Sequence, residues 1–481
     1  MSHPAPEGPP RIAAPLLNLS SPRRIHVVGI GGPGMSSIAI ILHKWGHRVT
    51  GSDVRQSSTT DALIELGIPV VFSHDRSHVD DAEIVTYSTA IPDDNVEVHV
   101  ARQNGAIVLH RGDVLGSISA QRRGVGVVGT HGKTTTTSLL MVMLRASGND
   151  VSYVIGAEVR DTGISADSGN SDLLVVEMDE SDGTAEVVPV EGLVVLNVDI
   201  DHLDYFGTEQ AIVNTFAEMI ARVPGPVVIN GDDANSMLAL NAIRRDVPQG
   251  DNRRIITFGH SENVDVRIMN FNETEQGSVF DIVINGETTN VSLPLRGAHN
   301  AMNCAASLAM AVTYGASIDR AAKAAATFQG VDRRFEEHGY VRNALLIDDY
   351  AHLPAEIEAV VHAAVTHPHR SGKVIAVFQP NRFHRVAQMA DDYAHCFSQA
   401  DVVVITDIYA SGTQPIEGVT GKLIADAIVK QHPDANVVWA PSRSDVLDAV
   451  LAHLSAGDVC ISMGCGDIGN LPEEIMQRVS S

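Results

Sequence analysis

Cysteine is scarce in this sequence, which has four cysteines among 481 residues, and only Cys460 and Cys465 lie close together. With no histidine or second cysteine pair beside them, these two do not predict a zinc site or a disulfide framework. Long apolar runs are absent as well, and no stretch of about 18 apolar residues could cross a bilayer. We therefore expect reduced thiols, a cytoplasmic location and no membrane partner.

Basic residues are also few, since 34 lysines and arginines stand against 59 aspartates and glutamates and give a formal net charge of −25. Such an acidic chain repels other polyanions at long range, which excludes nucleic acid as an expected partner. Small anions such as nucleotides remain compatible with this charge, because a local loop can gather backbone N–H groups and a few cations.

The N-terminus, residues 1–22, lacks the basic start and the unbroken apolar stretch of a signal peptide. Its richness in proline and small polar residues predicts a disordered tail. The rest of the chain is long enough for about three domains of roughly 100 to 200 residues each. Changes in the sequence pattern place these domains at residues 23–120, 121–330 and 331–481.

Strand-like apolar runs alternate with helical patterns in all three domains, which predicts an α/β fold built on parallel sheets. We expect the first domain to be Rossmann-like and the third to be doubly wound. The second contains a segment, residues 266–295, in which apolar and polar residues alternate around Gly and Asn. This pattern predicts a small antiparallel β appendage on the second domain.

A glycine-rich turn, GIGGPGM, follows the first strand and places Gly29, Gly31 and Gly34 at the spacing of a diphosphate-binding loop. Glycines let the backbone approach a diphosphate that faces a helix N-terminus. Taken alone, the pattern predicts NAD, with Asp53 at the end of the next strand on the ribose. A UDP-sugar satisfies the same geometry.

A second loop, in VVGTHGKTTTT, is the strongest single signal in the chain. Gly132, Lys133 and Thr134 end a strand-to-helix connection that supplies convergent N–H groups, a phosphate-binding ammonium and a hydroxyl for Mg²⁺. Val127 stands where the standard pattern has glycine, so the loop is a variant. It predicts a binding site for ATP or GTP.

An acidic segment, EMDESDGT, begins with Glu177 directly after an apolar strand. Carboxylates that emerge beside a phosphate loop suit Mg²⁺, although an acidic turn on the surface has the same sequence pattern. His202 follows another strand, where a histidine is either structural or able to reach a second cation.

Further polar residues gather in the last two fifths of the chain. Asn300 and Asn303 begin an alanine-rich helix, where amides either cap the helix or bind a nucleotide base. Other candidates lie in GVDRRFEE, LIDDYAHLPAEI and FQPNRFHR, and they are Arg333, Arg334, Asp348, Asp349, Tyr350, His352, Arg382 and Arg385. Any one pair of these could be only a surface ion pair, worth about 0 to 1 kcal/mol. The prediction therefore depends on the order in which all of them occur along the chain.

In this order, the motifs resemble those of the Mur ligases. The matching elements include GIGGPGMSSIA, VVGTHGKTTTT, EMDESDGT, GAHNAMNCAAS and IDDYAHLPAEI, and they run from about residue 23 to about residue 470. The resemblance implies an ATP-dependent ligase that forms an amide between the lactyl carboxylate of UDP-N-acetylmuramate and L-alanine, through an acyl phosphate, in peptidoglycan precursor synthesis. It also implies that GIGGPGM holds a UDP-sugar and not a dinucleotide.

The resemblance implies a role for each matching position. The residues implied to bind the UDP-sugar are Gly29, Gly31, Gly32, Gly34, Met35, Asp53, Ser88, Thr89, Asp179, Glu180 and Ser181. Those implied to bind ATP are Gly129, Thr130, His131, Gly132, Lys133, Thr134, Thr135, Asn300, Asn303, Arg334 and Asp349. Those implied to receive the amino acid are Tyr350, His352, Arg382 and Arg385.

The same resemblance implies two Mg²⁺ ions, replaceable by Mn²⁺, at Thr134, Glu177 and His202. Catalysis is implied to depend on Lys133, Glu177, His202, Arg334 and His352, with His352 a candidate base for the amine. The expected partners are therefore the three small-molecule substrates, bound by a monomer or a homodimer.

The sequence departs from the family pattern at Ala351, Leu353, Asn381, Phe383 and His384. These positions cluster at the amino-acid end, so the sequence leaves the accepted amino acid open. A recycling ligase of the same family, which attaches a preformed tripeptide, would share nearly every site. A nicotinamide-dependent oxidoreductase would leave the phosphate loop without a purpose, and a nucleotide switch would bind ATP without turnover.

Overall fold

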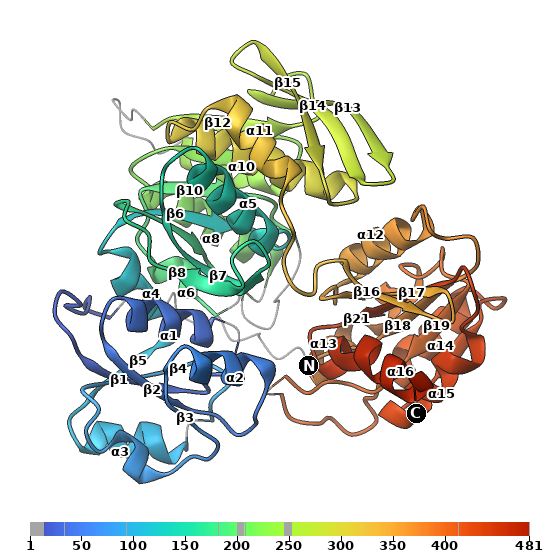
Figure 1. The fold of residues 1–481 in the computed structure, drawn as a ribbon, viewed down its shortest axis with the longest axis horizontal. Helices are drawn as coiled ribbons and strands as arrows, with labels where there is room; N and C mark the ends of the chain where they lie inside the picture. The colour runs from blue at the N-terminus through green and yellow to red at the C-terminus, as the bar shows by residue number, and fades with distance from the viewer. Residues whose placement is uncertain are drawn as a thin grey trace. The chain divides into compact units, whose positions relative to one another are not determined.

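The computed structural model describes residues 14–480, apart from 33, 93, 181, 200–205, 207, 245–252 and 412. The chain divides into two compact units, of which the first ends at Val331 and the second begins at Asp332. The first unit contains two sheets and the second contains one (Figure 1). Within the described residues, no helix is long and apolar enough to cross a membrane.

The first sheet has five parallel strands in the order β3-β2-β1-β4-β5. Their bounds are β1 Arg24–Val28, β2 Arg48–Ser52, β3 Val70–Val71, β4 Ile84–Tyr87 and β5 Ile107–His110. The connecting helices are α1 Met35–Lys44, α2 Ser58–Glu65, η1 Arg76–Val79, α3 Val96–Gln103 and α4 Arg111–Ser119. This is the strand order of a Rossmann-like half, and ligands of such sheets bind at the carboxyl ends of β1 and β4, where the order reverses.

Residues 14–22, which we predicted to be part of a disordered tail, instead pack against the first sheet. Leu17 and Leu19 are buried, and the Leu17 N–H donates a hydrogen bond of 3.0 Å to Ser117 Oγ of α4. Burying such side chains is worth about 1.5 to 3 kcal/mol each, which offsets the ordering of a short segment. The tail prediction was therefore too long, and residues 1–13 lie outside the described residues.

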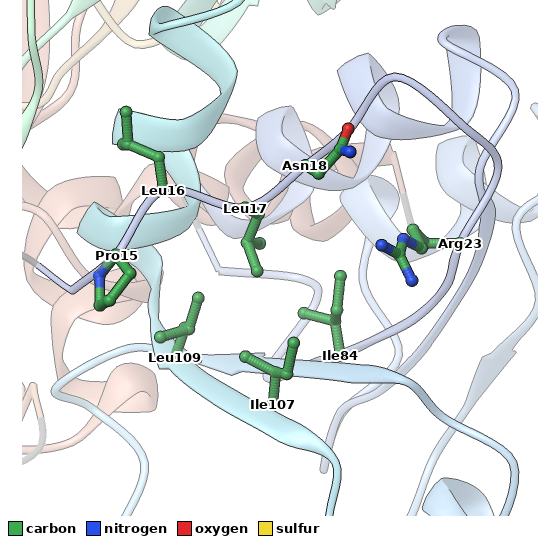
Figure 2. A pocket seen from close by; sticks show the side chains of 8 residues that line it. All are labelled: Pro15, Leu16, Leu17, Asn18, Arg23, Ile84, Ile107 and Leu109. Atoms are coloured by element: carbon green, nitrogen blue, oxygen red, sulfur yellow. The ribbon is translucent and has the colours of Figure 1, made fainter.

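This N-terminal segment closes one side of a mostly apolar pocket of about 330 Å³. Figure 2 shows Leu17 directed toward Ile84 and Ile107, the first residues of β4 and β5. The pocket therefore lies at the amino ends of these strands, whereas the glycine-rich turn lies at the carboxyl end of β1.

Glu97 of α3 is a buried carboxylate in the first domain that accepts several hydrogen bonds. Its oxygens accept from Ser52 Oγ at 2.6 Å and from the Nδ1 atoms of His74 and His78 at 2.7 Å each, and His26 Nε2 lies 3.7 Å away. Burial alone would raise the pKa of Glu97, but the hydrogen bonds outweigh it and lower this pKa to about 2. The ionised carboxylate therefore stabilises the fold.

Replacing Glu97 with Gln should lower the free energy of unfolding at pH 7 by about 3 kcal/mol, because the shift of this pKa from 4.5 to about 2 is lost. A carboxyl group with a depressed pKa stabilises the fold above its unfolded pKa and loses this effect as the pH falls. The difference between the two proteins should therefore shrink as the pH falls from about 4.5 toward 2 in denaturant titrations.

The matched control is Glu83→Gln, which removes a partly exposed partner of Arg24 on the same sheet. Such a pair is worth about 0 to 1 kcal/mol. Equal destabilisation by both substitutions would contradict the stabilising role of ionised Glu97.

The second sheet has ten strands in the order β15-β14-β13-β12-β11-β10-β6-β9-β7-β8. Their bounds are β6 Arg123–Val128, β7 Ser152–Val159, β8 Ile164–Asp167, β9 Leu173–Glu177, β10 Gly192–Val195, β11 Val227–Asn230, β12 Ile255–Gly259, β13 Val266–Thr274, β14 Gly277–Ile284 and β15 Glu287–Leu293. The central strands are parallel, rich in valine and buried on both faces, as expected for a sheet between two helical layers.

The two helical layers of this sheet contribute to different hydrophobic clusters. One layer contains α5 Lys133–Ala146, α10 Ala298–Thr313 and α11 Ile318–Ala326. The other contains α8 Glu209–Arg222 and α9 Ala234–Arg244, and the short helix α6 Thr184–Val187 follows β9.

The predicted antiparallel segment forms β13, β14 and β15, which are appended to the second domain as predicted. Strand β13 pairs with β12 in parallel, so the three strands extend the second sheet at one edge (Figure 1). The alternating pattern predicted the hairpins correctly, whereas the parallel pairing with β12, which ends at Gly259 shortly before β13, is not encoded in this alternation.

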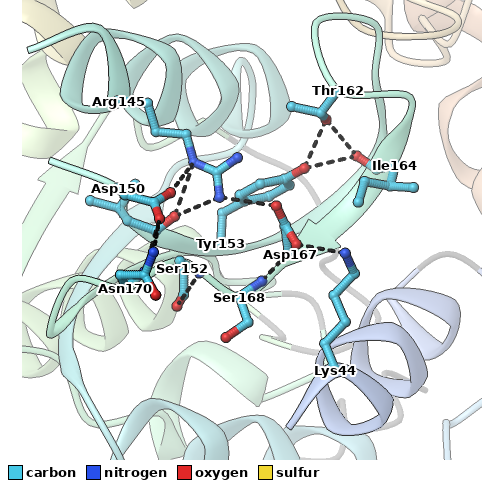
Figure 3. A network of polar contacts seen from close by, with 12 residues as sticks. Lys44, Arg145, Asp150, Ser152, Tyr153, Thr162, Ile164, Asp167, Ser168 and Asn170 are labelled. Carbon is cyan, nitrogen blue, oxygen red and sulfur yellow. Dashed lines mark hydrogen bonds and ion pairs between the residues drawn. The ribbon is translucent and has the colours of Figure 1, made fainter. Parts of the chain in front are cut away.

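At the other edge, the hairpin β7–β8 is fixed by a charged network (Figure 3). Asp167 accepts hydrogen bonds from Arg145 Nη2 of α5 at 3.1 Å and from Lys44 Nζ of α1 at 2.7 Å. Arg145 also lies over the ring of Tyr153, whose hydroxyl donates to Thr162. The hairpin thus links the helix that follows the phosphate loop to the first helix of the chain.

The third sheet has six strands in the order β16-β17-β21-β18-β19-β20, and only β16 is antiparallel to its neighbour. The strand bounds are β16 Glu336–Val341, β17 Ala344–Asp349, β18 Val374–Phe378, β19 Val402–Ile405, β20 Val437–Trp439 and β21 Val459–Met463. The helices are α12 Pro354–Val365, α13 Phe383–Met389, η2 Ala390–Ala394, α14 Lys422–Gln431, α15 Arg443–His453, η3 Asp467–Asn470 and α16 Leu471–Ser480. Helices cover both faces, as predicted for a doubly wound domain.

Candidate active site

The glycine-rich turn lies at the carboxyl end of β1, where the order of the first sheet reverses. Gly29 and Gly34 have φ angles of 72° and 76°, which favour glycine. The N–H groups of Gly29 and Ile30 donate to the carbonyl oxygen of Ser52 at 2.8 and 3.0 Å. The turn is therefore fixed to the end of β2 and leads into the N-terminus of α1, an arrangement suited to a diphosphate.

Asp53 does not project from this turn as a ribose ligand would. Its Oδ2 accepts a hydrogen bond from the Gly31 N–H at 2.9 Å, and its Oδ1 accepts from Val54 and Arg55 N–H at 2.7 and 3.2 Å. The carboxylate thus stabilises the conformation of the glycine-rich turn. This arrangement differs from the NAD interpretation of the spacing, in which Asp53 would hold a ribose.

The other residues predicted to bind the UDP-sugar lie in different environments. The Met35 side chain is buried in the hydrophobic core, and its N–H donates to the Gly32 carbonyl, so the structure gives it a packing role. Ser88 is half-buried and Thr89 is exposed just after β4, the neighbour of β1. Ser181 lies outside the described residues.

The phosphate loop, Gly129–Gly132, joins β6 to α5 as predicted. Gly129 and Gly132 have φ angles of 143° and 82°, and a Cβ atom on Gly132 would collide with the Asn303 side chain. Asn303 donates to Asn300 Oδ1 at 3.2 Å, and both lie in α10, which packs beside α5. The structure therefore brings the two predicted amides to the phosphate loop.

Lys133 is the first residue of α5, and its ammonium bends back over the phosphate loop. It donates to the Gly129 carbonyl at 2.6 Å and lies 2.9 Å from Glu180 Oε1. Burial alone would lower the pKa of Lys133, but the carboxylates of Glu180 and Asp179 outweigh it, so the pKa is raised. The ammonium is therefore charged where a phosphate would bind.

Thr134 and Glu177 meet at the ends of the adjacent strands β6 and β9. The Thr134 hydroxyl donates to Glu177 Oε1 at 2.9 Å, and the Gly156 N–H donates to Glu177 Oε2 at 2.7 Å. A hydroxyl and a carboxylate are hard oxygen ligands, so this pair fits Mg²⁺ completed by phosphate oxygens and water. In the described residues, no group of three or more His, Cys, Asp or Glu could hold a metal ion, and His202 lies outside them.

The third strand beside the phosphate loop, β10, contributes residues that the sequence analysis did not name. Asn197 Oδ1 accepts from the His131 N–H at 2.8 Å, and its Nδ2 donates to the His131 carbonyl at 3.1 Å. The Asp199 N–H donates to the Thr130 hydroxyl at 2.9 Å. Their position after a valine-rich strand next to a phosphate loop was a usable signal. Thr135 is buried at the first turn of α5.

The second unit has its own polar cluster at the carboxyl ends of β17 and β18. Asp349, at the end of β17, is buried and accepts from the N–H groups of Ala351 and Phe335 at 2.7 Å each. Burial raises the pKa of Asp349 to about 6, although the charge of Arg334 pulls it down. The guanidinium of Arg334 lies 5.1 Å from the centre of the Tyr350 ring, and that of Arg333 lies 5.2 Å from it.

The residues predicted to receive the amino acid lie in the same part of this unit. His352 Nδ1 is 3.1 Å from the Tyr350 carbonyl and 3.4 Å from Glu356. Arg382 is half-buried after β18 with a φ angle of 62°, and its N–H donates to the Tyr409 carbonyl. Arg385 is buried and donates to Asn381 at 2.8 Å, which gives it a packing role as well.

Comparison with known proteins covers all three regions of the chain. Residues 24–123 match the model of the Mur ligase family, catalytic domain. Residues 127–311 match the Mur ligase middle domain, and residues 333–466 match the glutamate ligase domain of Mur ligases. These matches follow the three sheets in order.

Similar curated proteins extend over nearly the whole chain. The UDP-N-acetylmuramate–L-alanine ligase of Pelotomaculum thermopropionicum is 36% identical over 461 residues, which are 95% of this chain and 98% of that protein. The protein of the same name from Brucella anthropi is 36% identical over 469 residues, covering 94% of this chain and 97% of the relative.

Solved structures of such ligases share the fold. The UDP-N-acetylmuramate-alanine ligase of Thermotoga maritima superimposes with a TM-score of 0.79 at 26% identity, over 95% of this chain and 99% of that one. A murein peptide ligase from Psychrobacter arcticus has a TM-score of 0.73 at 22% identity, over 95% and 99%, which shows the fold alone. With the phosphate loop, the acidic turn and a curated relative of this similarity, the chain belongs to the Mur ligase family.

Proposed function

We propose that this chain is an ATP-dependent ligase that joins L-alanine to the lactyl carboxylate of UDP-N-acetylmuramate in peptidoglycan precursor synthesis. One observation carries the proposal: two anion-binding loops lie on either side of one acidic turn, Glu177–Thr184. Lys133 and Thr134, which directly follow the phosphate loop, contact Glu180 and Glu177 of the turn. On the other side, Arg111 joins the same turn to the glycine-rich loop. A triphosphate and a UDP-sugar can therefore be bound by one unit.

The reaction follows from what these loops can hold. An oxygen of the lactyl carboxylate attacks the γ-phosphorus of ATP, the bond to the bridging oxygen breaks, and ADP leaves. The amino group of alanine then attacks the acyl carbon of the resulting acyl phosphate, inorganic phosphate leaves and the amine gives up a proton. Phosphoryl transfer of this kind depends mainly on positioning and electrostatics. Lys133 supplies a fixed positive charge and the loop N–H groups supply dipoles.

Thr134 and Glu177 are the residues that would hold Mg²⁺ on the ATP phosphates, with His202 proposed for a second ion. When bound, such an ion neutralises charge on the transferred phosphoryl group. The Gly156 N–H keeps Glu177 oriented toward Thr134. Oxygen ligands of this kind accept Mn²⁺ as well as Mg²⁺.

The second unit is proposed to supply Arg334 to the γ-phosphate, Asp349 to the nucleotide and Tyr350, His352, Arg382 and Arg385 to the amino acid. Ala351 and Leu353, which depart from the family pattern, are both buried.

The acceptor is tested by phosphate release from ATP and UDP-N-acetylmuramate, with L-alanine, glycine, L-serine and a preformed tripeptide supplied separately. We expect L-alanine to give kcat/KM at least about tenfold above glycine, because one buried methyl group is worth about 1 to 3 kcal/mol. Mass spectrometry of the product should show one added alanine residue.

A tripeptide preferred over every single amino acid would replace this proposal with the recycling reaction. If the protein binds ATP but hydrolyses none of it with any of the four acceptors, the ligase proposal is wrong and a nucleotide switch is the remaining interpretation.

A further inference from the structure

Arg111 connects the two anion-binding loops of the first unit. It is the first residue of α4, directly after β5, at the edge of the first sheet. Its Nε donates to Asp182 Oδ2 at 2.7 Å and its Nη2 donates to Asp179 Oδ2 at 2.8 Å. Both aspartates belong to the acidic turn that also holds Glu177 and Glu180.

The third nitrogen of this guanidinium faces the glycine-rich turn. A Cβ atom built on Gly34 would lie only 2.9 Å from Arg111 Nη1. Gly34 precedes α1, a helix of ten residues that has no side-chain cap and no acidic residue in its first turn. In the described part of the chain, Nη1 donates no hydrogen bond to a protein acceptor. Arg111 thus presents a donor to the end of α1 where an anion would bind.

The charges around Arg111 decide what it can do. Asp182 is only 6% exposed, and the Arg111 side chain is 19% exposed, so solvent screens this cluster weakly. The guanidinium remains charged, since burial, which alone would lower its pKa, is outweighed by Asp182 and Asp179 and the pKa is raised. One positive charge therefore lies between two carboxylates on one side and the expected diphosphate site on the other.

The acidic turn also contacts the two residues that follow the phosphate loop. Its Glu180 lies 2.9 Å from Lys133 Nζ, and its Glu177 accepts from the Thr134 hydroxyl. Two polyanions bound at the two loops would repel each other and the acidic turn. Arg111 holds Asp179 and Asp182, so a ligand that fixes its guanidinium also fixes the acidic turn whose Glu180 and Glu177 contact Lys133 and Thr134. The second ligand then binds residues that are already ordered, which reduces the entropy lost on its binding.

We propose that Arg111 is a positioning residue that couples the two ligands, so that a bound UDP-sugar strengthens the binding of ATP and the reverse. This inference rests on the proposed function, because it requires a UDP-sugar at the glycine-rich turn. The coupling is reciprocal by thermodynamic necessity. A purely structural Arg111, which only holds α4 to the acidic turn, would change stability without changing the ratio of affinities.

The test is the coupling factor, the ratio of the Kd of a non-hydrolysable ATP analogue with Mg²⁺ in the absence and presence of saturating UDP-N-acetylmuramate. Calorimetric titration of the full chain gives both constants. In Arg111→Met, which keeps the length of the side chain without its charge, we expect this factor to fall at least about fivefold. Arg111→Lys should retain part of the coupling, because it keeps the charge but loses the fork that binds both aspartates.

The matched control is Arg123→Met, in the same unit. Arg123 begins β6, at the end of the strand remote from the phosphate loop, and its Nε and Nη2 donate to Glu191 at 2.8 and 2.7 Å. This substitution removes an arginine that also binds carboxylates, and it should leave the coupling factor unchanged.

An Arg111→Met protein with the same coupling factor as Arg123→Met would overturn the inference. If Arg111→Met does not fold, Arg111→Lys decides, and an unchanged factor in that variant overturns the inference equally. If the wild-type protein binds both ligands with a coupling factor of one, the inference about Arg111 is overturned, but the proposed function is not. Wild-type protein that does not bind the UDP-sugar would overturn the proposed function itself.

Discussion

Lys133→Ala should lower ATP-dependent phosphate release at least about 10³-fold, because the ammonium is the fixed positive charge of the phosphate loop. The structure shows a second effect of this substitution. Lys133 lies 2.9 Å from Glu180, whose side chain is 3% exposed, and removing the cation of a buried ion pair costs about 3 to 5 kcal/mol. We therefore expect a lower melting temperature as well as lost turnover.

The two effects are separated by the double variant Lys133→Ala, Glu180→Gln. Removing the buried charge should restore the melting temperature toward that of the wild type and leave phosphate release as low as in the single variant. Glu180→Gln alone serves as the control for any direct role of Glu180. Turnover that returns in the double variant would mean that Lys133 serves only to neutralise Glu180, and its role in binding phosphate would have to be abandoned.

The parts of the fold that the sequence predicted correctly are those encoded by short stretches of chain. Valine-rich runs such as β6 must be buried on both faces, and a glycine at Gly132 is required both by its φ angle and by the nearby Asn303. The strand, the loop and the helix α5 are therefore specified within about 25 residues. Chemistry at the end of such a strand can be predicted before the sheet is known.

The parts that could not be predicted depend on residues far apart in the sequence. Arg111 lies 68 positions before Asp179, and without the fold an arginine after a strand is indistinguishable from a solvated surface charge. Asp53 has the spacing of a ribose ligand, but its carboxylate is occupied by backbone N–H groups. A different limit applies to β13 to β15, where the alternation predicts hairpins but does not specify β12 as their neighbour, although β12 ends only a few residues before β13.

The two adjacent arginines of the second unit show the same contrast, since their residue type does not separate them and only the family resemblance implied a role for Arg334. Arg333 donates through Nε to Asp348 at 2.9 Å, and through Nη2 and Nη1 to the carbonyl oxygens of Gly464 and Gly466 at 2.6 and 3.1 Å. It therefore joins β17 to the loop after β21. Arg334 lies over Tyr350 beside Asp349, which is the polar cluster proposed for the nucleotide and the amino acid.

Substituting each arginine in turn should consequently damage different properties. Arg333→Ala leaves the buried carboxylate of Asp348 without its cation, so we expect a loss of about 3 kcal/mol in unfolding free energy. Turnover per folded molecule should change little. Arg334→Ala should lower kcat about 10³-fold, as expected when an arginine that neutralises a transferred phosphoryl group is removed. It should destabilise the fold less than Arg333→Ala, because the carboxylate of Asp349 keeps the N–H donors of Phe335 and Ala351.

Each variant is the control for the other, because the two differ by one position and remove the same group. Thermal unfolding and kcat at saturating substrates should be measured on both, with Arg334→Lys added to separate charge from geometry. Arg334→Lys should recover part of kcat, since a lysine keeps the charge but not the planar fork. The opposite pattern, with Arg333→Ala inactive but stable and Arg334→Ala unstable but active, would reverse the two assignments and place the phosphate-directed charge on Arg333.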